Sequence, residues 1–300
     1  MITVTERRIP SSDGVHQLFC RVYQPDGEIR GLFHVVHGMN EHMERYDLFM
    51  REMAEQGYLC YGFDNLGHGR TVNSDSELGY LVDWRFMVAD VQNVSRMMKR
   101  ENGIALPCFL MGHSMGSFIA RCASNPQIWN KVIYMGTGGP NPAAKPGLLL
   151  IKRRIRQEGQ YAHSPEIQKL AFGSYSKHFK AEADSIAWLS NKKEVRDAYR
   201  RDKFCTFSFT LNGYYNLVKL QTLSNSKTWF NHVSADLPIL LLSGTDDPVG
   251  SYGKGVAAVY KLLKRRGKNV RMKLYESYRH EILNDDSHDE VVRDILEFIA

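Results

Sequence analysis

The sequence predicts an α/β fold, in which a mostly parallel, doubly wound sheet is covered by helices on both faces and interrupted by a helical insertion. Short, continuously apolar runs such as Gly31–Val36 and Tyr58–Phe63 are typical of strands buried on both faces. Helical patterns follow these runs, so strands and helices alternate along the chain. The alternation stops between the strand that ends near Met135 and the strand that starts near Leu237.

The predicted elements follow in a regular order. Two antiparallel strands are expected before residue 30, and the second, Gln17–Tyr23, is expected at an edge of the sheet. The later strands are predicted at residues 31–36, 58–63, 107–111, 131–135, 237–243 and 270–275. Helices are predicted at residues 46–56, 86–102, 117–123, 254–266 and 290–299.

The inserted segment differs from the rest of the chain in pattern and in charge. It shows helical patterns at residues 148–156, 164–171 and 212–224 and no convincing strand. We therefore expect an α/β core formed by residues 1–140 and 232–300, with residues 141–231 as a helical cap. Such a cap lies above the carboxyl ends of the strands, where folds of this class bind ligands. Residues 141–235 hold 16 Lys and Arg against 7 Asp and Glu, more than the whole net charge of +6.

The basic excess has two interpretations, a solvated surface or a face that attracts anionic interfaces and phosphate-bearing substrates. No nucleic-acid-binding motif accompanies it, so a nucleic-acid partner is not expected. The sequence has no run of 18 apolar residues, and its first eight residues lack the apolar core of a secretory signal. Five scattered cysteines predict neither disulfides nor a cysteine-built metal site. These features predict a cytoplasmic protein.

The pentapeptide Gly112-His-Ser-Met-Gly116 lies between a predicted strand and a predicted helix. This context predicts a sharp turn that exposes the Ser114 hydroxyl at the end of the sheet, although an ordinary turn with a surface serine has the same pattern. A serine nucleophile needs a histidine base, and the histidine needs an oriented carboxylate. Asp247 and His280 each follow a later predicted strand, in the chain order Ser, Asp, His. We therefore predict Ser114, Asp247 and His280 as a catalytic triad.

Other residues compete for some of these roles. Asp246 is the alternative carboxylate, and His288 and His232 are the alternative bases, although His288 lies in a run of acids that is typical of a solvated surface. An oxyanion needs two backbone N–H donors. We predict that these come from Met39, in the loop after the strand at residues 31–36, and from Met115, which follows the nucleophile.

Three histidines near the first parallel strand invite comparison with a metal site. His34, His37 and His42 do not have an established ligand spacing, and no carboxylate pair completes them. His34 alternates into a strand, where a core histidine is expected. The sequence therefore predicts no metal site and no cofactor.

Further motifs extend over nearly the whole chain: His37-Gly-Met-Asn-Glu-His42 with Arg45-Tyr46, Asp64-Asn-Leu-Gly-His-Gly69, Gly112–Gly116, Phe172-Gly-Ser-Tyr175, Ala187-Trp-Leu-Ser190, Phe207–Tyr214, Gly244-Thr-Asp-Asp-Pro248 and His280-Glu281. Together they resemble the monoacylglycerol lipase and bacterial lysophospholipase group of α/β-hydrolases. The resemblance implies the α/β-hydrolase fold and a serine hydrolase that forms an acyl-enzyme on Ser114. The implied substrate is a small-molecule ester or single-chain lipid, such as a monoacylglycerol or a lysophospholipid. Met39 and Asn65 depart from the residues that the lipases have at these positions.

The resemblance also implies that the cap encloses the acyl chain and can meet membranes. Gly147–Ile151 is apolar and precedes a run of cations that contains Lys152, Arg153, Arg154 and Arg156. This combination suits transient contact with a membrane surface, and an ordinary amphipathic cap helix would show it too. Two other functions use the same residues: an acyltransferase or peptidase with the same triad, and a binding protein that has lost catalysis.

Overall fold

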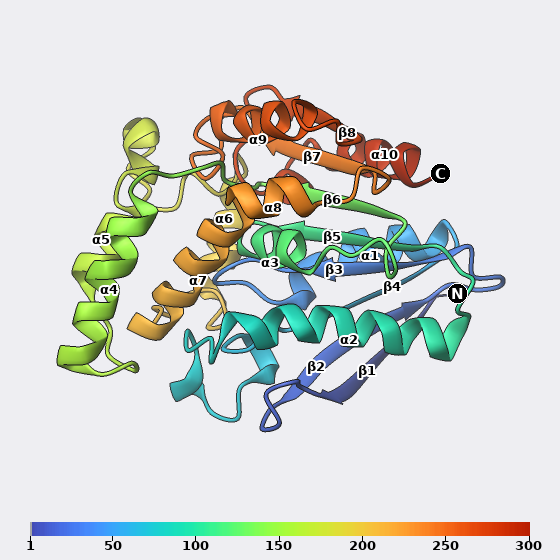
Figure 1. Ribbon diagram of the computed structural model, residues 1–300, viewed down its shortest axis with the longest axis horizontal. Helices are drawn as coiled ribbons and strands as arrows, with labels where there is room; N and C mark the ends of the chain where they lie inside the picture. Colours follow the sequence, from blue (N-terminus) through green and yellow to red (C-terminus); the bar gives the residue numbers. More distant parts are fainter. Residues whose placement is uncertain (1) are drawn as a thin grey trace.

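The computed structural model describes residues 2–300. Its strands form one eight-stranded sheet in the order β1-β2-β4-β3-β5-β6-β7-β8 (Figure 1). The strand β2 pairs antiparallel with both β1 and β4, and all later neighbours are parallel. The strands are β1 (Thr3–Pro10), β2 (Gln17–Gln24), β3 (Gly31–Val36), β4 (Tyr58–Phe63), β5 (Cys108–His113), β6 (Lys131–Met135), β7 (Ile239–Gly244) and β8 (Val270–Tyr275).

Helices connect the strands and form the insertion. The α-helices are α1 (Asp47–Glu55), α2 (Trp84–Asn102), α3 (Met115–Ala123), α4 (Ala144–Glu158), α5 (Pro165–Phe172), α6 (Lys193–Arg201), α7 (Leu211–Ser224), α8 (Lys227–His232), α9 (Lys254–Lys264) and α10 (His288–Ile299). Short 3₁₀ helices are η1 (Met43–Tyr46), η2 (Gly69–Thr71), η3 (Asp75–Glu77), η4 (Tyr175–Glu182) and η5 (Ile282–Asn284).

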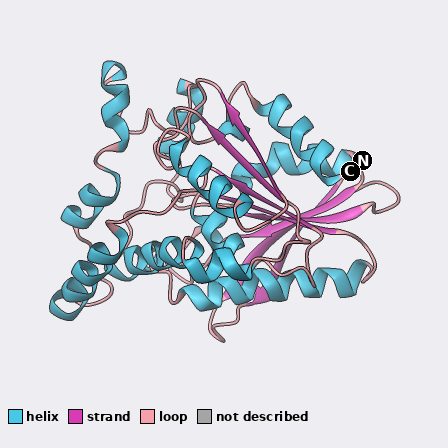
Figure 2. Ribbon diagram, turned by 45° about the horizontal axis from the view of Figure 1, so that its top comes forward, coloured by secondary structure: helices cyan, strands magenta, loops and turns pink. Residues whose placement is uncertain are grey.

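Both faces of the sheet are covered, as the apolar runs predict (Figure 2). Along the central strand β5, Cys108 and Leu110 pack into one apolar cluster, and Phe109 and Met111 pack into the other. The helices α2, α3 and α9 cover the first face, whereas α1 and α10 cover the second. Because side chains of a strand point alternately to opposite faces, a strand with helices on both sides must be apolar at every position.

The predicted strands and core helices are confirmed within a few residues at their ends. The expectation that Gln17–Tyr23 lies at an edge of the sheet is wrong, because β2 lies between β1 and β4. The edge is β1, whose side chains are mostly exposed on both faces. This exposure explains why its apolar alternation is too weak to be recognised in the sequence.

The insertion between β6 and β7 contains helices α4–α8. The helices α4 and α5 lie beyond the carboxyl ends of the parallel strands, whereas α8 packs beside β6 and α3 (Figure 1). The helices predicted at residues 148–156, 164–171 and 212–224 are confirmed as α4, α5 and α7. The helix α6 was not predicted from the sequence, because it is short and strongly charged, and its apolar stripe is only Val195, Ala198 and Tyr199. The last inserted long helix, α7, packs against both α4 and the core helix α3.

Candidate active site

The predicted nucleophile lies on a strained turn between β5 and α3. Ser114 has φ 53° and ψ −120°, a backbone conformation that is costly for a residue with a side chain. The flanking positions, 112 and 116, must be glycine because neighbouring backbone atoms leave no room for a Cβ atom. A Cβ atom on Gly112 would lie 2.3 Å from the Gly116 carbonyl oxygen, and one on Gly116 would lie 2.1 Å from the Val36 carbonyl oxygen. The Gly-x-Ser-x-Gly pattern therefore follows from how closely β5, α3 and the end of β3 approach one another.

The predicted acid and base lie together beyond the ends of β7 and β8. The Nδ1 atom of His280 lies 3.0 Å from the Asp247 Oδ1 atom, and both side chains are buried. Asp247 also accepts hydrogen bonds from the Val249 N–H (2.8 Å) and the Ser243 hydroxyl (3.1 Å). Burial alone would raise the pKa of Asp247, but His280 and these donors bring it below its usual range. Asp247 is thus held as a carboxylate beside the imidazole.

The competing residues have other partners. The Asp246 backbone N–H donates to the Tyr278 carbonyl, whereas the carboxylate that pairs with His280 is that of Asp247. His288 is half-buried rather than solvated, with its Nε2 atom 2.6 Å from Glu52 Oε2, whereas the exposed His232 contacts the carbonyl oxygen of its own helix at Thr228. Geometry therefore favours Asp247 and His280 over these alternatives.

His280 and Ser114 approach the same point at the end of β6. The Ser114 N–H donates to the Met135 carbonyl (3.0 Å), and a Cβ atom on the next residue, Gly136, would lie 3.0 Å from His280 Cε1. The His280 ring also lies 4.7 Å from the ring of His113, the residue before the serine. The topology thus brings Ser114 and the Asp247–His280 pair to one end of the sheet, although Ser114 and His280 are 166 positions apart in the sequence.

The predicted oxyanion loop lies directly against the serine. A Cβ atom on Gly38 would lie 2.8 Å from Ser114 Cβ, so only glycine allows this approach. His37 holds the loop, because its Nδ1–H donates to the Gly38 carbonyl (2.8 Å) and its Nε2 accepts from the Asn65 N–H (2.8 Å). The Asn65 amide also donates to the His37 carbonyl (3.1 Å). Asn65, which departs from the lipase pattern, therefore helps to shape this loop. Met39 packs against the core on one side of the serine, and the buried Met115 opens helix α3 on the other.

A comparison with protein-family models places residues 27–287 in the family described as serine aminopeptidase, S33. The chain belongs to this α/β-hydrolase family. It is 29% identical to the monoglyceride lipase of Homo sapiens over 276 residues, which cover 90% of this chain and 81% of that protein. It is 25% identical to the monoacylglycerol lipase of Mycolicibacterium smegmatis, over 93% of this chain and 91% of the relative. A thermostable carboxyl esterase of Bacillus coagulans, solved with glycerol, superposes with a TM-score of 0.93 at 29% identity over 99% of this chain and 98% of its own.

A buried cluster of charged side chains lies next to the candidate site. No role was predicted for these residues from the sequence. Glu41 accepts hydrogen bonds from the Gly38 N–H and from the Tyr46 hydroxyl (3.0 Å). Its Oε1 atom also lies 2.9 Å from His113 Nδ1. Arg45 forms a two-pronged ion pair with Glu281 at 2.6 and 2.7 Å. The residues belong to the motifs His37–His42, Arg45-Tyr46 and His280-Glu281, but only the fold shows that these motifs meet.

The charges in this cluster shift one another's protonation. Burial alone would raise the pKa of Glu41, but His113 and Arg45 bring it well below its usual range. Burial alone would lower the pKa of His113, yet the Glu41 carboxylate raises it above its ordinary value. The other ring nitrogen of His113, Nε2, lies 3.3 Å from the His280 carbonyl oxygen. Both ring nitrogens therefore face acceptors, an arrangement that suits the protonated imidazolium.

The three histidines considered as metal ligands are separately engaged. His34 Nδ1 lies 2.8 Å from the Ser95 hydroxyl, and burial lowers the pKa of His34 to about 3. His37 uses both ring nitrogens to hold the loop after β3. His42 Nε2 lies 2.7 Å from the cap residue Asp202, in a group with Cys205 whose ligand atoms lie within 4.8 Å of one another. Since His42 and Asp202 already satisfy one another, we interpret this group as a hydrogen-bonded contact between core and cap.

Aromatic side chains connect the predicted base to the loop after β3 through the cap. Successive ring centroids lie 5.1–6.3 Å apart in an aromatic row. The row runs through His280, Trp188, Tyr175, Phe172, Tyr214, Phe209, Phe207, His68 and His37. Several of its cap rings are only half-buried and so leave apolar surface uncovered above the site. The sequence showed these residues as family motifs, but the fold arranges them into one row.

The His113–Glu41 pair predicts a pH-dependent contribution to stability. Because the folded state raises the pKa of His113, its contribution is full below about pH 6.5, the ordinary value for histidine, and is lost as the pH rises through the raised value. We expect His113→Gln to lower the free energy of unfolding more at about pH 6 than at about pH 9. Urea unfolding at both values measures this.

A Glu41→Gln background serves as the control for that measurement, because it removes the carboxylate that raises the pKa of His113. In this background, the loss of unfolding free energy caused by His113→Gln should no longer decrease as the pH rises. An effect of His113→Gln that is constant or grows with pH in the wild-type background would contradict the interpretation.

Proposed function

We propose that the protein is a serine hydrolase that cleaves carboxylic esters of single-chain lipids, of the monoacylglycerol or lysophospholipid type, through an acyl-enzyme on Ser114. The observation that carries this proposal is the convergence of a strained serine, a buried Asp247–His280 pair and a glycine-bearing loop at one end of the sheet. The names of the relatives and of the superposed esterase support ester hydrolysis rather than peptide hydrolysis.

In the proposed mechanism, Ser114 attacks the ester carbonyl carbon while His280 accepts the hydroxyl proton. Asp247 orients the imidazole and stabilises its positive charge, which its low pKa allows. The negative charge that develops on the carbonyl oxygen is received by the N–H groups of Met39 and Met115. His280 then gives the proton to the leaving alcohol, and water repeats the sequence to release the acid.

We further propose that residues 141–231 act as a cap that receives the acyl chain. The aromatic row defined above places apolar rings between the cap and both predicted catalytic segments. Apolar surface of this kind favours an acyl chain, because burying each methylene is worth about 0.8 kcal/mol. It disfavours a charged peptide, whose polar groups would lose water without new partners.

The proposed activity is tested with a substrate panel on the wild type and on Ser114→Ala. The panel holds p-nitrophenyl esters of graded acyl length, a monoacylglycerol, a lysophosphatidylcholine and an aminoacyl anilide. We expect ester cleavage by the wild type and a loss of roughly 10³-fold or more in Ser114→Ala. Product analysis with added alcohol or amine separates hydrolysis from acyl transfer. Activity retained by Ser114→Ala, or cleavage of the anilide in preference to the esters, would refute the proposal.

The role of Asp247 has a matched control in its neighbour Asp246. We expect Asp247→Asn to lower kcat by roughly 10⁴-fold, because an uncharged amide cannot stabilise the imidazolium. Asp246→Asn should stay within a few-fold of the wild type, since the carboxylate that pairs with His280 is that of Asp247. Steady-state kinetics on a short p-nitrophenyl ester measure both. Equal losses in the two variants would reassign the carboxylate.

The proposed location is cytoplasmic, with transient contact of the cap at a membrane surface. No helix among residues 2–300 is long and apolar enough to span a bilayer. In the cap, Leu149 of α4 is 71% exposed and Leu170 of α5 is 67% exposed, within a segment rich in lysine and arginine. Exposed leucines beside cations suit the surface of an anionic membrane.

We expect the double substitution Leu149→Ser and Leu170→Ser to weaken binding to anionic phosphatidylglycerol vesicles by roughly ten-fold or more, measured by cosedimentation. The control is Ile104→Ser, which removes an equally exposed side chain (76%) beyond the end of α2, away from the cap. Binding that is insensitive to the leucines, or equally sensitive to Ile104, would exclude the cap as the membrane-binding surface.

A further inference from the structure

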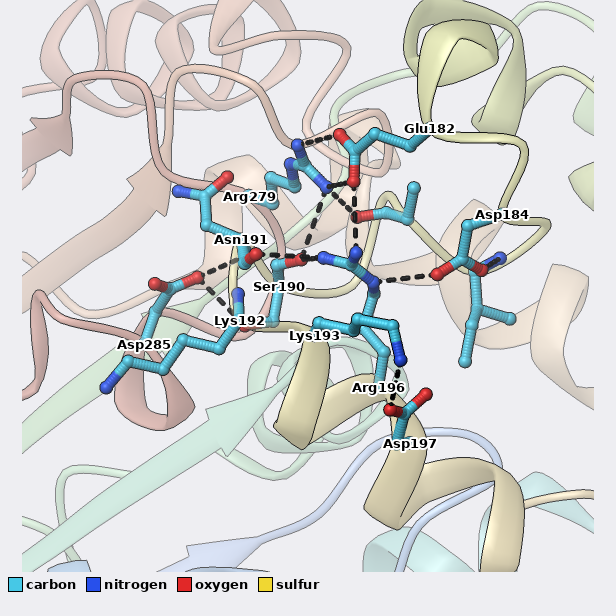
Figure 3. Close-up of polar contacts among 12 residues, drawn as sticks. Glu182, Asp184, Ser190, Asn191, Lys192, Lys193, Arg196, Asp197, Arg279 and Asp285 are labelled. Atoms are coloured by element: carbon cyan, nitrogen blue, oxygen red, sulfur yellow. Dashed lines mark hydrogen bonds and ion pairs between the residues drawn. The ribbon is translucent and has the colours of Figure 1, made fainter.

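The two residues that flank the proposed base are both ion-paired, one to the cap and one to the core. On the core side, Glu281 pairs with Arg45. On the cap side, Arg279 pairs with Glu182, with Nη1 3.2 Å from the Glu182 Oε2 atom and Nη2 bound to Oε1 (Figure 3). The residue before His280 is therefore anchored to the cap, and the residue after it is anchored to the core.

Arg279 does more than form a surface ion pair. Its side chain is only 11% exposed, and its guanidinium lies 4.3 Å above the ring of Phe179. The same guanidinium donates to the carbonyl oxygens of Ala187 (2.6 Å) and Ser190 (3.2 Å). Hydrogen bonds from a charged donor are stronger than neutral ones, and the planar guanidinium fixes their directions. Arg279 thus holds both ends of the cap segment Ala187–Ser190.

The backbone of that cap segment in turn holds the base. The His280 N–H donates to the Trp188 carbonyl (3.3 Å), and the Glu281 N–H donates to the Leu189 carbonyl (2.8 Å). The Trp188 ring packs 5.3 Å from the His280 ring. Two consecutive backbone N–H groups of the segment that carries the base therefore donate to the cap.

Contacts on either side of this pairing extend it. Asn191 donates through its amide to the Ser277 carbonyl (2.9 Å), ahead of the base. After the base, Asp285 accepts hydrogen bonds from the Ser190 hydroxyl (2.9 Å) and the Asn191 N–H (2.6 Å). The exposed turn after β8, in which Ser277 has φ 62°, has little packing of its own. Core groups hold this turn too, because the Ser277 N–H donates to the Thr245 hydroxyl (2.8 Å) and the Tyr278 carbonyl accepts from the Asp246 N–H (2.9 Å). The cap and the core together therefore set its conformation.

A second arginine supports the first. Arg196 of α6 is buried, and it donates to the carbonyl oxygens of Ser190 (2.6 Å) and Asn191 (2.9 Å). It pairs with Glu182 at 3.0 Å and with Asp184 at 2.8 Å. Glu182 is therefore shared by two arginines, one on α6 and one beside the base (Figure 3). Sharing makes a network whose geometry is more restricted than that of an isolated pair.

We propose that Arg279 is a positioning residue for the reaction: through Glu182 and the Ala187–Ser190 carbonyls, it fixes the loop that places His280 between Asp247 and Ser114. The inference rests on the proposed function, in which His280 is the base. Catalysis requires such a group to be held within about 0.5 Å of its productive position, and a 1 Å displacement can cost about 10²-fold in rate. The cap residues 182–190, together with Arg196, are then part of the framework that positions the base.

The test compares Arg279→Met and Arg279→Lys with Lys193→Met, on p-nitrophenyl acetate and on p-nitrophenyl decanoate. Lys193 is the matched control, because it forms an exposed ion pair with Asp197 on α6 and does not contact the loop of the base. We expect Arg279→Met to lower kcat about 10- to 100-fold, by the same factor for both esters, with little change in KM. Arg279→Lys should recover part of kcat, because lysine still supplies a charged donor, and Lys193→Met should match the wild type.

Glu182→Gln provides a second variant that leaves the two carbonyl contacts of Arg279 in place. It should lower kcat less than Arg279→Met does and by equal factors on the two esters. Thermal melts and titration with a fluorophosphonate, which counts reactive Ser114, correct every rate for the folded fraction. If Arg279→Met does not fold, Glu182→Gln and Arg279→Lys still decide the question.

Several results would overturn the inference. A loss confined to the decanoate, or confined to KM, would assign Arg279 to the acyl-binding cap instead. An unchanged kcat in Arg279→Met, or a loss fully explained by the unfolded fraction, would remove its role. If Ser114→Ala is inactive while Arg279→Met is normal, only the positioning role fails; if Ser114→Ala is active, the proposed function itself fails.

Discussion

The close approach of three backbone segments around Ser114 is the constraint on which the rest of the site depends. The end of β3, the end of β5 and the start of α3 meet where a single Cβ atom on Gly38, Gly112 or Gly116 would collide with a neighbour. The surrounding structure also holds Ser114 in a backbone conformation that costs roughly 1–3 kcal/mol. The same approach places the loop after β3 beside the serine, where oxyanion donors are needed.

Buried charges stabilise this arrangement from behind. Glu41 accepts a hydrogen bond from the Gly38 N–H, and Arg45 of η1 forms an ion pair with Glu281, beside the proposed base. Such charges are tolerated in the interior only when they are paired, and removing one partner typically costs about 3–5 kcal/mol. The network therefore joins the loop after β3 directly to the loop after β8. Its charges also keep Glu41 ionised and His113 protonated over a wider pH range than either group would show alone.

The inserted helices contribute to the site in two different ways. The segment at residues 182–197 is hydrogen-bonded to the loop of His280 and is continuous with the core in its polar contacts. The helices α4 and α5 lie further out, where exposed leucines and cations face solvent. A cap built in this manner can carry apolar surface for a substrate without losing the geometry of the base. Of the polar helix α6, Arg196 belongs to the framework that we infer, because it donates to the carbonyl oxygens of Ser190 and Asn191.

The sequence by itself determined the α/β class, the insertion and the order Ser114, Asp247, His280, because apolar runs, glycine spacing and motif order are local properties. It misplaced β2, since which strand lies at an edge depends on pairing between distant segments. Only the tertiary structure decided that Glu41, His113, Arg45 and Glu281 form one cluster, and that Arg279 joins the base to the cap. These ion pairs join residues that are 72 to 236 positions apart and leave no periodic signal, so their partners appear only once the chain has folded.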